Sequence, residues 1–346
     1  MEKLKNLLYE LTCDNAPSGG EQTISSLYRL LNATGCDIRT DALSNIYAIK
    51  ECNIKNAKRV LIDTHIDEVS LIVTEIDKNG FLHFDINAGI DPKILPASEV
   101  SVMGKGQITG IISTKPPHMQ TADDYKTAID IKDMVIDIGY DYENAIKRVK
   151  KGDLVVLKSK SFSMINNRFC AKSIDNRASA AIMIAILEEL KEKELDFDLY
   201  ISFSSLEEFT GNGAKCVGYN VFPDEAIVLD TTHAKTPGAC DHKCYEMGGG
   251  PAIGVSPILN DDLTRELISI CENNDIKYQI EGICSKTGTN ADNIALSSKG
   301  VKTALVSLPI KYMHTPSEVV SLEDMRDIKK LILNFLLDKR RRLTYE

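Results

Sequence analysis

The chain has 346 residues, of which 43% are hydrophobic and 26% charged, and its net charge at pH 7 is −9. This composition is ordinary for a water-soluble globular protein, and the acidic balance argues against a nucleic acid or a membrane surface as partner. The longest apolar runs fall short of the roughly 20 residues that span a bilayer, and the nine cysteines lack framework spacing, so we expect reduced thiols and a cytoplasmic location.

Residues 1–69 are predicted to form helices followed by strands. The first twelve residues, MEKLKNLLYELT, have charges within their apolar stripe, which is atypical of a signal peptide. Ser18 and Glu21 have the spacing of a capping box, which would open the helix that follows them. The apolar residues 60–62 then predict a buried strand that ends at His65.

Residues 70–163 have a different character, because short β-type runs follow one another without a helical period. The runs are VSLIVTEID, FLHFDI, EVSVMG, QITGIIST, DMVIDIG and LVVLKS. Turn signals such as Lys78-Asn79-Gly80 separate them. Short strands at this spacing predict a small barrel or sandwich.

After residue 164 helices and strands alternate again, beginning with a long helical pattern at 176–194. Two similar segments around a different middle predict one α/β domain, in two parts at 1–69 and 164–346, interrupted by an inserted β-rich domain at 70–163. The alternation favours a central, mostly parallel sheet with helices on its faces.

Side chains of the types that bind metals follow the predicted strands of this sheet. They are His65, Glu207, Glu208, Asp230 and His314. In open α/β sheets the functional site lies outside the carboxyl ends of the strands. Imidazoles and carboxylates are typical ligands of zinc and related divalent ions. The sequence therefore predicts one metal site at this edge.

Two further acids each have two interpretations. Asp67 lies two residues after His65, so the alternation of an extended chain would let it hold the imidazole, directly or through the backbone. The alternative is an exposed acid beside a core histidine. Asp175 precedes the long helix, where an N-cap is the default role. With the other ligands present, it is also a candidate for a carboxylate that bridges two metals.

The adjacent acids Glu207 and Glu208 are harder to explain as structural residues. Two carboxylates after a buried strand repel each other and lose hydration unless a cation or proton compensates. One acid can bind metal while the other accepts a proton from metal-bound water.

Other segments carry weaker signals. The segment 240–244 holds three soft metal ligands but no fourth, which disfavours a closed structural zinc site. The glycines of 247–251 lack the spacing of a dinucleotide loop and favour a close approach of the backbone to a substrate or a strand. The segment 286–292 is either an ordinary turn or a pocket wall. A final helix is predicted to begin at Ser321, with Asp324 at the capping-box position.

Taken together, these motifs resemble metallopeptidase family 42, the glutamyl and tetrahedral (TET-type) aminopeptidases, across essentially the whole chain. The matching stretches are 65–69, 115–119, 174–177, 207–208, 230–234, 288–291 and 312–320. Several ordered matches are far more specific than a single one.

The resemblance implies two co-catalytic divalent ions, zinc or cobalt. Asp175 would bridge them, Glu208 and His314 would complete one site, and His65 and Asp230 the other. Glu207 would be the general base, and Asp67 the orienting acid beside His65. The implied fold is a zinc-peptidase-like α/β/α domain with an inserted small barrel or PDZ-like domain, which is associated with assembly into dimers and twelve-subunit shells.

We therefore expect a dinuclear-metal aminopeptidase that acts on peptides with a free N-terminus and forms a homo-oligomer. One alternative is a glycoside hydrolase, since members of this family have been labelled endoglucanases, but the two histidines argue against it. A metal-dependent deacylase or carboxypeptidase is a closer alternative. A scaffold with a structural metal leaves Glu207 unexplained.

The chain departs from the family pattern at four places. Ser70 stands where glycine is usual, and residues 210–212 replace a glycine, an apolar residue and a basic residue. Asn290 replaces a common aspartate and Lys311 a common arginine. None of these changes removes an expected metal ligand, so they bear on the preferred substrate rather than on catalysis.

Overall fold

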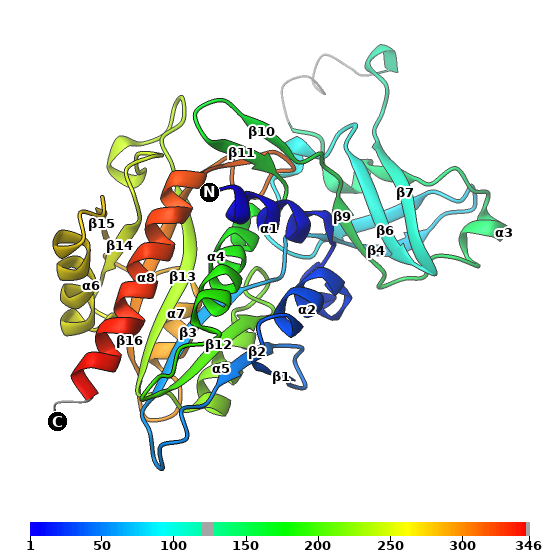
Figure 1. Cartoon of the computed structure of the whole chain (residues 1–346). Helices are drawn as coiled ribbons and strands as arrows, with labels where there is room; N and C mark the ends of the chain where they lie inside the picture. The colour runs from blue at the N-terminus through cyan, green and yellow to red at the C-terminus, as the bar shows by residue number, and fades with distance from the viewer. Residues whose placement is uncertain (120–127, 344–346) are drawn as a thin grey trace.

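The computed structural model describes residues 1–119 and 128–343. It contains a three-layer α/β/α unit and a closed six-stranded barrel that projects from one end of it (Figure 1). The predicted fold class, an α/β domain with an inserted small barrel, is confirmed.

The helices and strands have the following bounds. The helices are α1 (Glu2–Cys13), α2 (Ser25–Asn32), α3 (Tyr142–Ala145), α4 (Ile174–Leu190), α5 (Asn212–Val221), α6 (Asp261–Asn273), α7 (Asn290–Ala295) and α8 (Leu322–Leu343). The strands of the main sheet are β1 (Asp37–Thr40), β2 (Ile46–Lys50), β3 (Arg59–His65), β10 (Phe162–Met164), β11 (Arg168–Ala171), β12 (Asp198–Ser204), β13 (Glu225–His233), β14 (Ala252–Val255), β15 (Gln279–Gly282), β16 (Lys302–Lys311) and β17 (Glu318–Ser321). The strands of the barrel are β4 (Leu71–Ile76), β5 (Leu82–Ile86), β6 (Glu99–Gly104), β7 (Gly106–Ser113), β8 (Val135–Asp137) and β9 (Leu154–Leu157).

The middle of the main sheet is parallel. Its strand order is β1-β2-β12-β3-β13-β16-β17-β11-β10, with β14 and β15 attached beside β16. Strands β12, β3, β13 and β16 run parallel, with Ser204 opposite His65 and Asp230 opposite Ser307. Because these four strands point the same way, the residues that follow them meet at one edge of the sheet.

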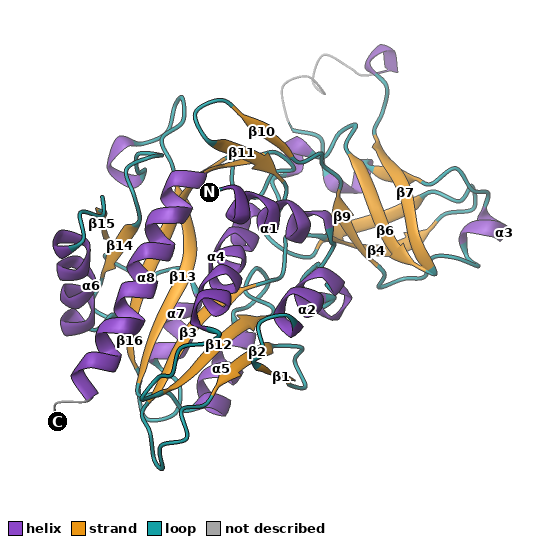
Figure 2. Ribbon diagram, in the orientation of Figure 1, coloured by secondary structure: helices purple, strands orange, loops and turns teal. Residues whose placement is uncertain are grey.

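Helices cover both faces of the sheet, as Figure 2 shows. Helices α1, α4, α6 and α8 contribute to the larger core, whereas α5 and α7 pack on the opposite face. Helix α4 is buried along almost its whole length, because it is built from alanine, isoleucine and leucine rather than from an apolar stripe. Each fully buried isoleucine or leucine contributes about 1.5–3 kcal/mol to folding.

The barrel is formed by the six β-type runs that the sequence indicates. Its strands close in the order β4-β5-β8-β7-β6-β9. Alternate side chains such as Val73, Phe84, Val100 and Val102 point inward and form a core of their own. Because a closed barrel leaves no free strand edge, this unit satisfies its backbone hydrogen bonds internally.

The capping-box prediction at Ser18 and Glu21 is wrong. Helix α2 begins at Ser25, and the Asp14 carboxylate caps it by accepting a hydrogen bond of 2.7 Å from the Ser26 N–H. A 3₁₀ turn at Glu21–Thr23 separates the motif from the helix. The Ser18 hydroxyl instead donates to Asp67, so the motif faces the sheet edge.

The glycine-rich segment 247–251 lies close to a neighbouring strand, as predicted. Gly250 has a φ of +83°, and a Cβ atom there would lie 2.0 Å from the carbonyl oxygen of Lys277. The Asp324 carboxylate accepts hydrogen bonds from the N–H groups of Gly248 and Gly250, at 2.7 and 2.9 Å. The Asp324 N–H donates to the Ser321 hydroxyl, so the start of α8 is capped as expected while its acid holds the glycine loop.

A buried acid under the sheet edge explains one departure from the family pattern. Asp63 on β3 is fully buried and accepts hydrogen bonds from the hydroxyls of Ser202 and Ser204. The Asn290 amide also donates to Asp63, at 2.9 Å. Burial raises the pKa of Asp63 to about 6. An aspartate at position 290 would place a second buried carboxylate against the first.

We predict that N290D destabilises the protein, and more so at pH 8 than at pH 5. Two carboxylates in one buried site raise the pKa of one of them, so a shared proton relieves the repulsion at low pH and is lost as the pH rises. The expected loss at pH 8 is on the order of 3 kcal/mol. Urea unfolding at both pH values measures it.

The double variant D63N/N290D is the matched control, since it exchanges the acid and the amide and should recover part of the lost stability. Equal destabilisation at both pH values, or no recovery in the double variant, would contradict this account.

Candidate metal centre

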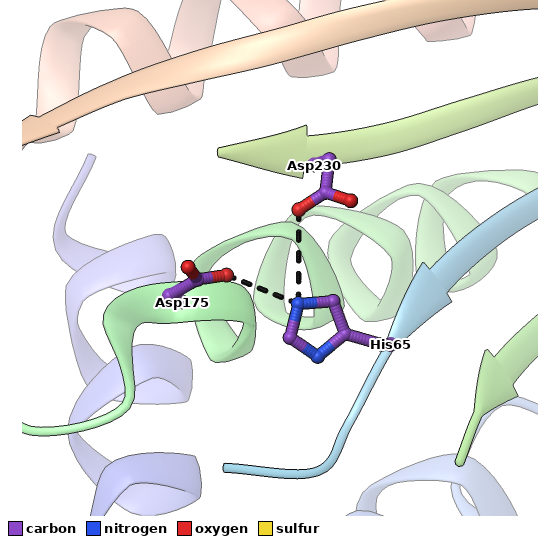
Figure 3. A group of neighbouring side chains, drawn as sticks. All are labelled: His65, Asp175 and Asp230. Atoms are coloured by element: carbon purple, nitrogen blue, oxygen red, sulfur yellow. Dashed lines mark hydrogen bonds and ion pairs between the residues drawn. The ribbon is translucent and has the colours of Figure 1, made fainter. Parts of the chain in front are cut away.

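All the predicted metal-ligand residues meet at the carboxyl edge of the parallel strands. His65 ends β3, and Asp230 lies near the end of β13. Glu207 and Glu208 follow β12, while His314 lies in the loop between β16 and β17. Asp175, at the start of α4, reaches His65 from the helix rather than from a strand (Figure 3).

Around His65 three carboxylates converge on one imidazole nitrogen. Its Nε2 lies 3.0 Å from Asp175 Oδ1, 3.7 Å from Asp230 Oδ1 and 3.9 Å from Glu207 Oε2. Figure 3 shows Asp175 and Asp230 directed at this nitrogen from two different elements. His65 and both aspartates are buried.

A second group surrounds His314. Its Nε2 lies 3.1 Å from Glu208 Oε2 and 3.6 Å from Asp175 Oδ2. Asp175 thus turns one oxygen toward each histidine, and its carboxylate joins the two groups. In each group of three the candidate ligand atoms lie within 4.8 Å of one another.

The default N-cap role of Asp175 is not what the structure shows. Asp175 and Asn176 both depart from helical backbone angles, so the regular helix starts only after Asn176, and the Asp175 carboxylate contacts imidazoles rather than the N–H groups of that helix. The peptide bond between Asp175 and Asn176 is cis.

The electrostatics of the cluster fit bound cations. Burial, together with the charges of Asp230 and Glu208, raises the pKa of Glu207 to about 9 despite the nearby His65. Burial also raises the pKa of Glu208 to about 7. Several acids crowded into a buried site repel each other unless positive charge compensates. Histidine nitrogens with carboxylate oxygens are a donor set for zinc or cobalt, so the residues fit two divalent ions.

Each imidazole is oriented by a backbone carbonyl on its other nitrogen. His65 Nδ1 lies 3.2 Å from the Asp67 carbonyl oxygen, and His314 Nδ1 lies 2.7 Å from that of Gly89. This contact leaves the Nε2 atoms facing the carboxylates. Although burial opposes it, hydrogen bonds with Asp175 and Glu208 raise the pKa of His314 to about 11.

Asp67 contacts His65 through its backbone, which is one of the two ways expected. Its carbonyl oxygen lies 3.2 Å from His65 Nδ1, and its carboxylate lies 3.6 Å from the same nitrogen. The carboxylate also makes contacts that the sequence analysis did not identify. It accepts hydrogen bonds from the N–H groups of Glu207 and Glu208, at 3.0 and 3.1 Å, and from the Ser18 hydroxyl, at 2.5 Å. Asp67 therefore fixes the backbone of the two glutamates.

Two buried acids at the site have roles that the sequence analysis did not identify. Glu318 accepts hydrogen bonds from the N–H groups of Asp175 and His314, at 3.0 and 2.7 Å. Glu21 accepts one from the Leu206 N–H at 3.0 Å. The sequence did hold a signal for Glu318, because it is an acid at the start of the apolar strand β17, shortly after His314.

Beneath the site lies a buried ion-pair network. Glu68 accepts from the ammonium of Lys172 at 2.6 Å, and the guanidinium of Arg177 lies 3.4 Å away. Arg177 is fully buried and also donates to the carbonyls of Ile66 and Leu11, at 2.9 and 2.8 Å. These bonds tie α4 to the loop after β3.

The cluster lies at the bottom of an open cavity of about 540 Å³. Thr287, Gly288 and Thr289 line it, so the segment 286–292 forms a pocket wall. His242 also faces the cavity, and the three possible metal-binding groups among the described residues include no member of the segment 240–244. In the parts of the chain at 1–119 and 128–343, no helix has both the length and the apolarity to cross a lipid bilayer.

Comparison with known proteins identifies the family. A model of the M42 glutamyl aminopeptidase family matches residues 44–331. A lysyl aminopeptidase of Pyrococcus furiosus is 29% identical, with 88% of this chain and 86% of the relative covered.

Two solved structures are similar over nearly the whole chain. A TET aminopeptidase from a marine-sediment thaumarchaeote has a TM-score of 0.91 and 28% identity, covering 97% of this chain and 96% of its own. The Pyrococcus horikoshii TET1 peptidase, which can assemble into a tetrahedron or a large octahedral shell, has a TM-score of 0.86 and 29% identity, covering 96% and 99%. The chain belongs to the M42 glutamyl aminopeptidase family and is a peptide hydrolase.

Proposed function

We propose that this protein is a dinuclear-metal aminopeptidase that removes N-terminal residues from peptides. The observation that carries the proposal is the Asp175 carboxylate, which turns one oxygen toward the His65 group and the other toward the His314 group. His65 and Asp230 would hold one ion, Glu208 and His314 the other, and Asp175 both.

When bound, two divalent ions supply Lewis-acid activation of the scissile carbonyl and of water. The chain's own residues supply the proton transfer. Glu207 lies beside Glu208 and outside the His314 group, and its Oε2 lies 3.9 Å from His65 Nε2. With His65 and Glu208 it makes up the third possible metal-binding group, which the two proposed ions would not use. It is the acid best placed to accept a proton from water and to return it to the leaving amine.

The position of Glu207 is set by its backbone. The Asp67 carboxylate accepts hydrogen bonds from the N–H groups of residues 207 and 208, and the Glu21 carboxylate accepts one from the N–H group of Leu206. Three consecutive amides are thus held by two buried carboxylates. We propose that Asp67 acts as a positioning residue for both glutamates, which lets the base keep its place while it gains and loses a proton.

The alternatives differ in what they require of the site. A glycoside hydrolase needs two carboxylates that face each other across a sugar, without a metal. Here the acids converge with two histidines in groups whose ligand atoms lie within 4.8 Å of one another. A deacylase or carboxypeptidase could use the same cluster, and a substrate panel separates these activities.

We predict two divalent ions per chain, zinc or cobalt, and activity that depends on them. Elemental analysis measures the ions, and hydrolysis of amino-acid anilides is compared with that of acylated amino acids, C-terminal substrates and cellulose, each with and without a chelator. Anilide hydrolysis should be lost with chelator and return on adding metal. Well under one ion per chain, with no gain on reconstitution, would overturn the assignment.

Substitutions of the two adjacent glutamates should have different effects on turnover and metal content. Glu207→Gln keeps the shape but removes the base, so both ions should stay bound while turnover falls by roughly 10²–10⁴-fold. Glu208→Gln removes a charged ligand, so metal content should fall and excess metal should restore part of the activity. Turnover and metal content are measured on the same preparations.

Each variant serves as the control for the other, because they differ by one position in the chain. Near-normal activity in Glu207→Gln, or loss of metal there but not in Glu208→Gln, would show that the two roles are assigned wrongly.

We also propose that the chain forms a homo-oligomer, from a dimer up to a dodecamer, through the barrel at 70–163. The barrel exposes Ile111, Met119 and Ile146, which are 43%, 59% and 48% accessible. The likeness to a TET1 peptidase that assembles into shells supports this. All nine cysteines are free, which supports a reducing, cytoplasmic setting.

Light scattering should therefore show an assembly larger than one chain, and its mass should fall in the double variant Ile111→Asp/Ile146→Asp. Charges buried at a subunit contact destabilise it. The control is Tyr219→Asp, on α5 of the α/β/α unit, where the side chain is 73% exposed. A monomeric wild type, or the same loss of mass in the control, would refute the role of the barrel.

A further inference from the structure

One acid of the cavity has no part in the proposed metal chemistry. Glu281 lies on β15, and its side chain is partly buried and lines the same cavity as the metal cluster. Its Oε1 accepts a hydrogen bond from the Thr232 hydroxyl at 2.6 Å, and its Oε2 accepts one from the Ser307 hydroxyl, also at 2.6 Å.

These two hydroxyls fix the carboxylate without neutralising it. In the parts of the chain that the structure describes, no lysine, arginine or histidine pairs with Glu281. Burial, together with the charge of a neighbouring acid, Asp230, raises the pKa of Glu281. A carboxylate has room for about four hydrogen bonds, so each oxygen can still accept another donor.

The other acids of the cavity are accounted for. Asp175, Glu208 and Asp230 are proposed metal ligands, and Glu207 is the proposed base. Two divalent ions would compensate these four charges and leave Glu281 as the acid without a counter-ion. A fixed, partly desolvated carboxylate at a cavity wall is suited to a cationic group of the ligand.

We propose that Glu281 is a specificity-determining residue that binds a protonated amine of the substrate. The amine can be the side chain of a basic N-terminal residue or the α-ammonium group itself. This inference rests on the proposed aminopeptidase function. Lys243 also lines the cavity, but its side chain is exposed on a short turn and has no comparable anchoring. The fixed charge should dominate the choice of substrate.

The test is kinetic and uses the metal-loaded enzyme. Lysyl, leucyl and glutamyl anilides are compared with wild type, Glu281→Gln and Glu281→Asp. A charge-assisted hydrogen bond lost in Glu281→Gln should lower kcat/KM by roughly 10–100-fold. If Glu281 binds the side-chain amine, the loss is confined to the lysyl substrate. If it binds the α-ammonium, all three substrates lose equally. Glu281→Asp keeps the charge and should lose less.

Metal content and the thermal midpoint of each variant show whether the protein is intact. Glu246→Gln is the matched control, since Glu246 is an exposed acid paired with Lys235 at 2.9 Å and does not line the cavity. Unchanged kcat/KM for every substrate in Glu281→Gln overturns the inference. A wild-type preference for the glutamyl anilide overturns the side-chain version, and the Glu281→Gln comparison then decides the α-ammonium version. A wild type that hydrolyses none of the three overturns the proposed function instead.

Discussion

The arrangement of this site depends on how several carboxylates fit into one buried space without their mutual repulsion destabilising the fold. Four parallel strands deliver acids and imidazoles to a single edge, where their charges repel unless cations compensate. Hydrogen bonds from backbone amides stabilise several of these carboxylates. Asp67 is held by the amides of residues 207 and 208, Glu318 by those of 175 and 314, and Glu21 by that of 206. Acids outside the proposed ligand set thereby hold the segments that carry the proposed metal ligands.

This arrangement separates two kinds of acid by their partners. Asp175, Asp230 and Glu208 face imidazoles and point into the cavity, whereas Glu68 and Glu318 accept bonds from the protein and stay beneath it. Glu281 belongs to neither kind, since neutral hydroxyls hold it while it still faces the cavity. In our proposals the same residue type serves metal binding, positioning and substrate recognition.

The elements that could be predicted from sequence were those with strong local periodicity. Short β-type runs between turn signals indicated the six barrel strands, a long helical pattern indicated α4, and the meeting of the ligand types at strand ends followed from the parallel topology. Contacts between segments distant in sequence could not be read in this way. Ser18 and Glu21 have the local spacing of a cap, yet their partners, Asp67 and Leu206, come from other parts of the sheet edge. The contact of Asp67 with its near neighbour His65 was expected, but the hydrogen bond from an amide 140 residues away to its carboxylate was not.

Through the Gly89 carbonyl, the inserted segment helps to orient one imidazole of the proposed metal centre. Gly89 lies between β5 and β6, yet its oxygen contacts Nδ1 of His314, a residue 225 positions later. A Cβ atom at this glycine would lie 3.0 Å from the same nitrogen, so the contact admits no larger residue without displacement. The barrel is therefore not an interchangeable cassette. A chimaera that carried a foreign barrel would have to reproduce this one carbonyl to keep the His314 ring in the same orientation.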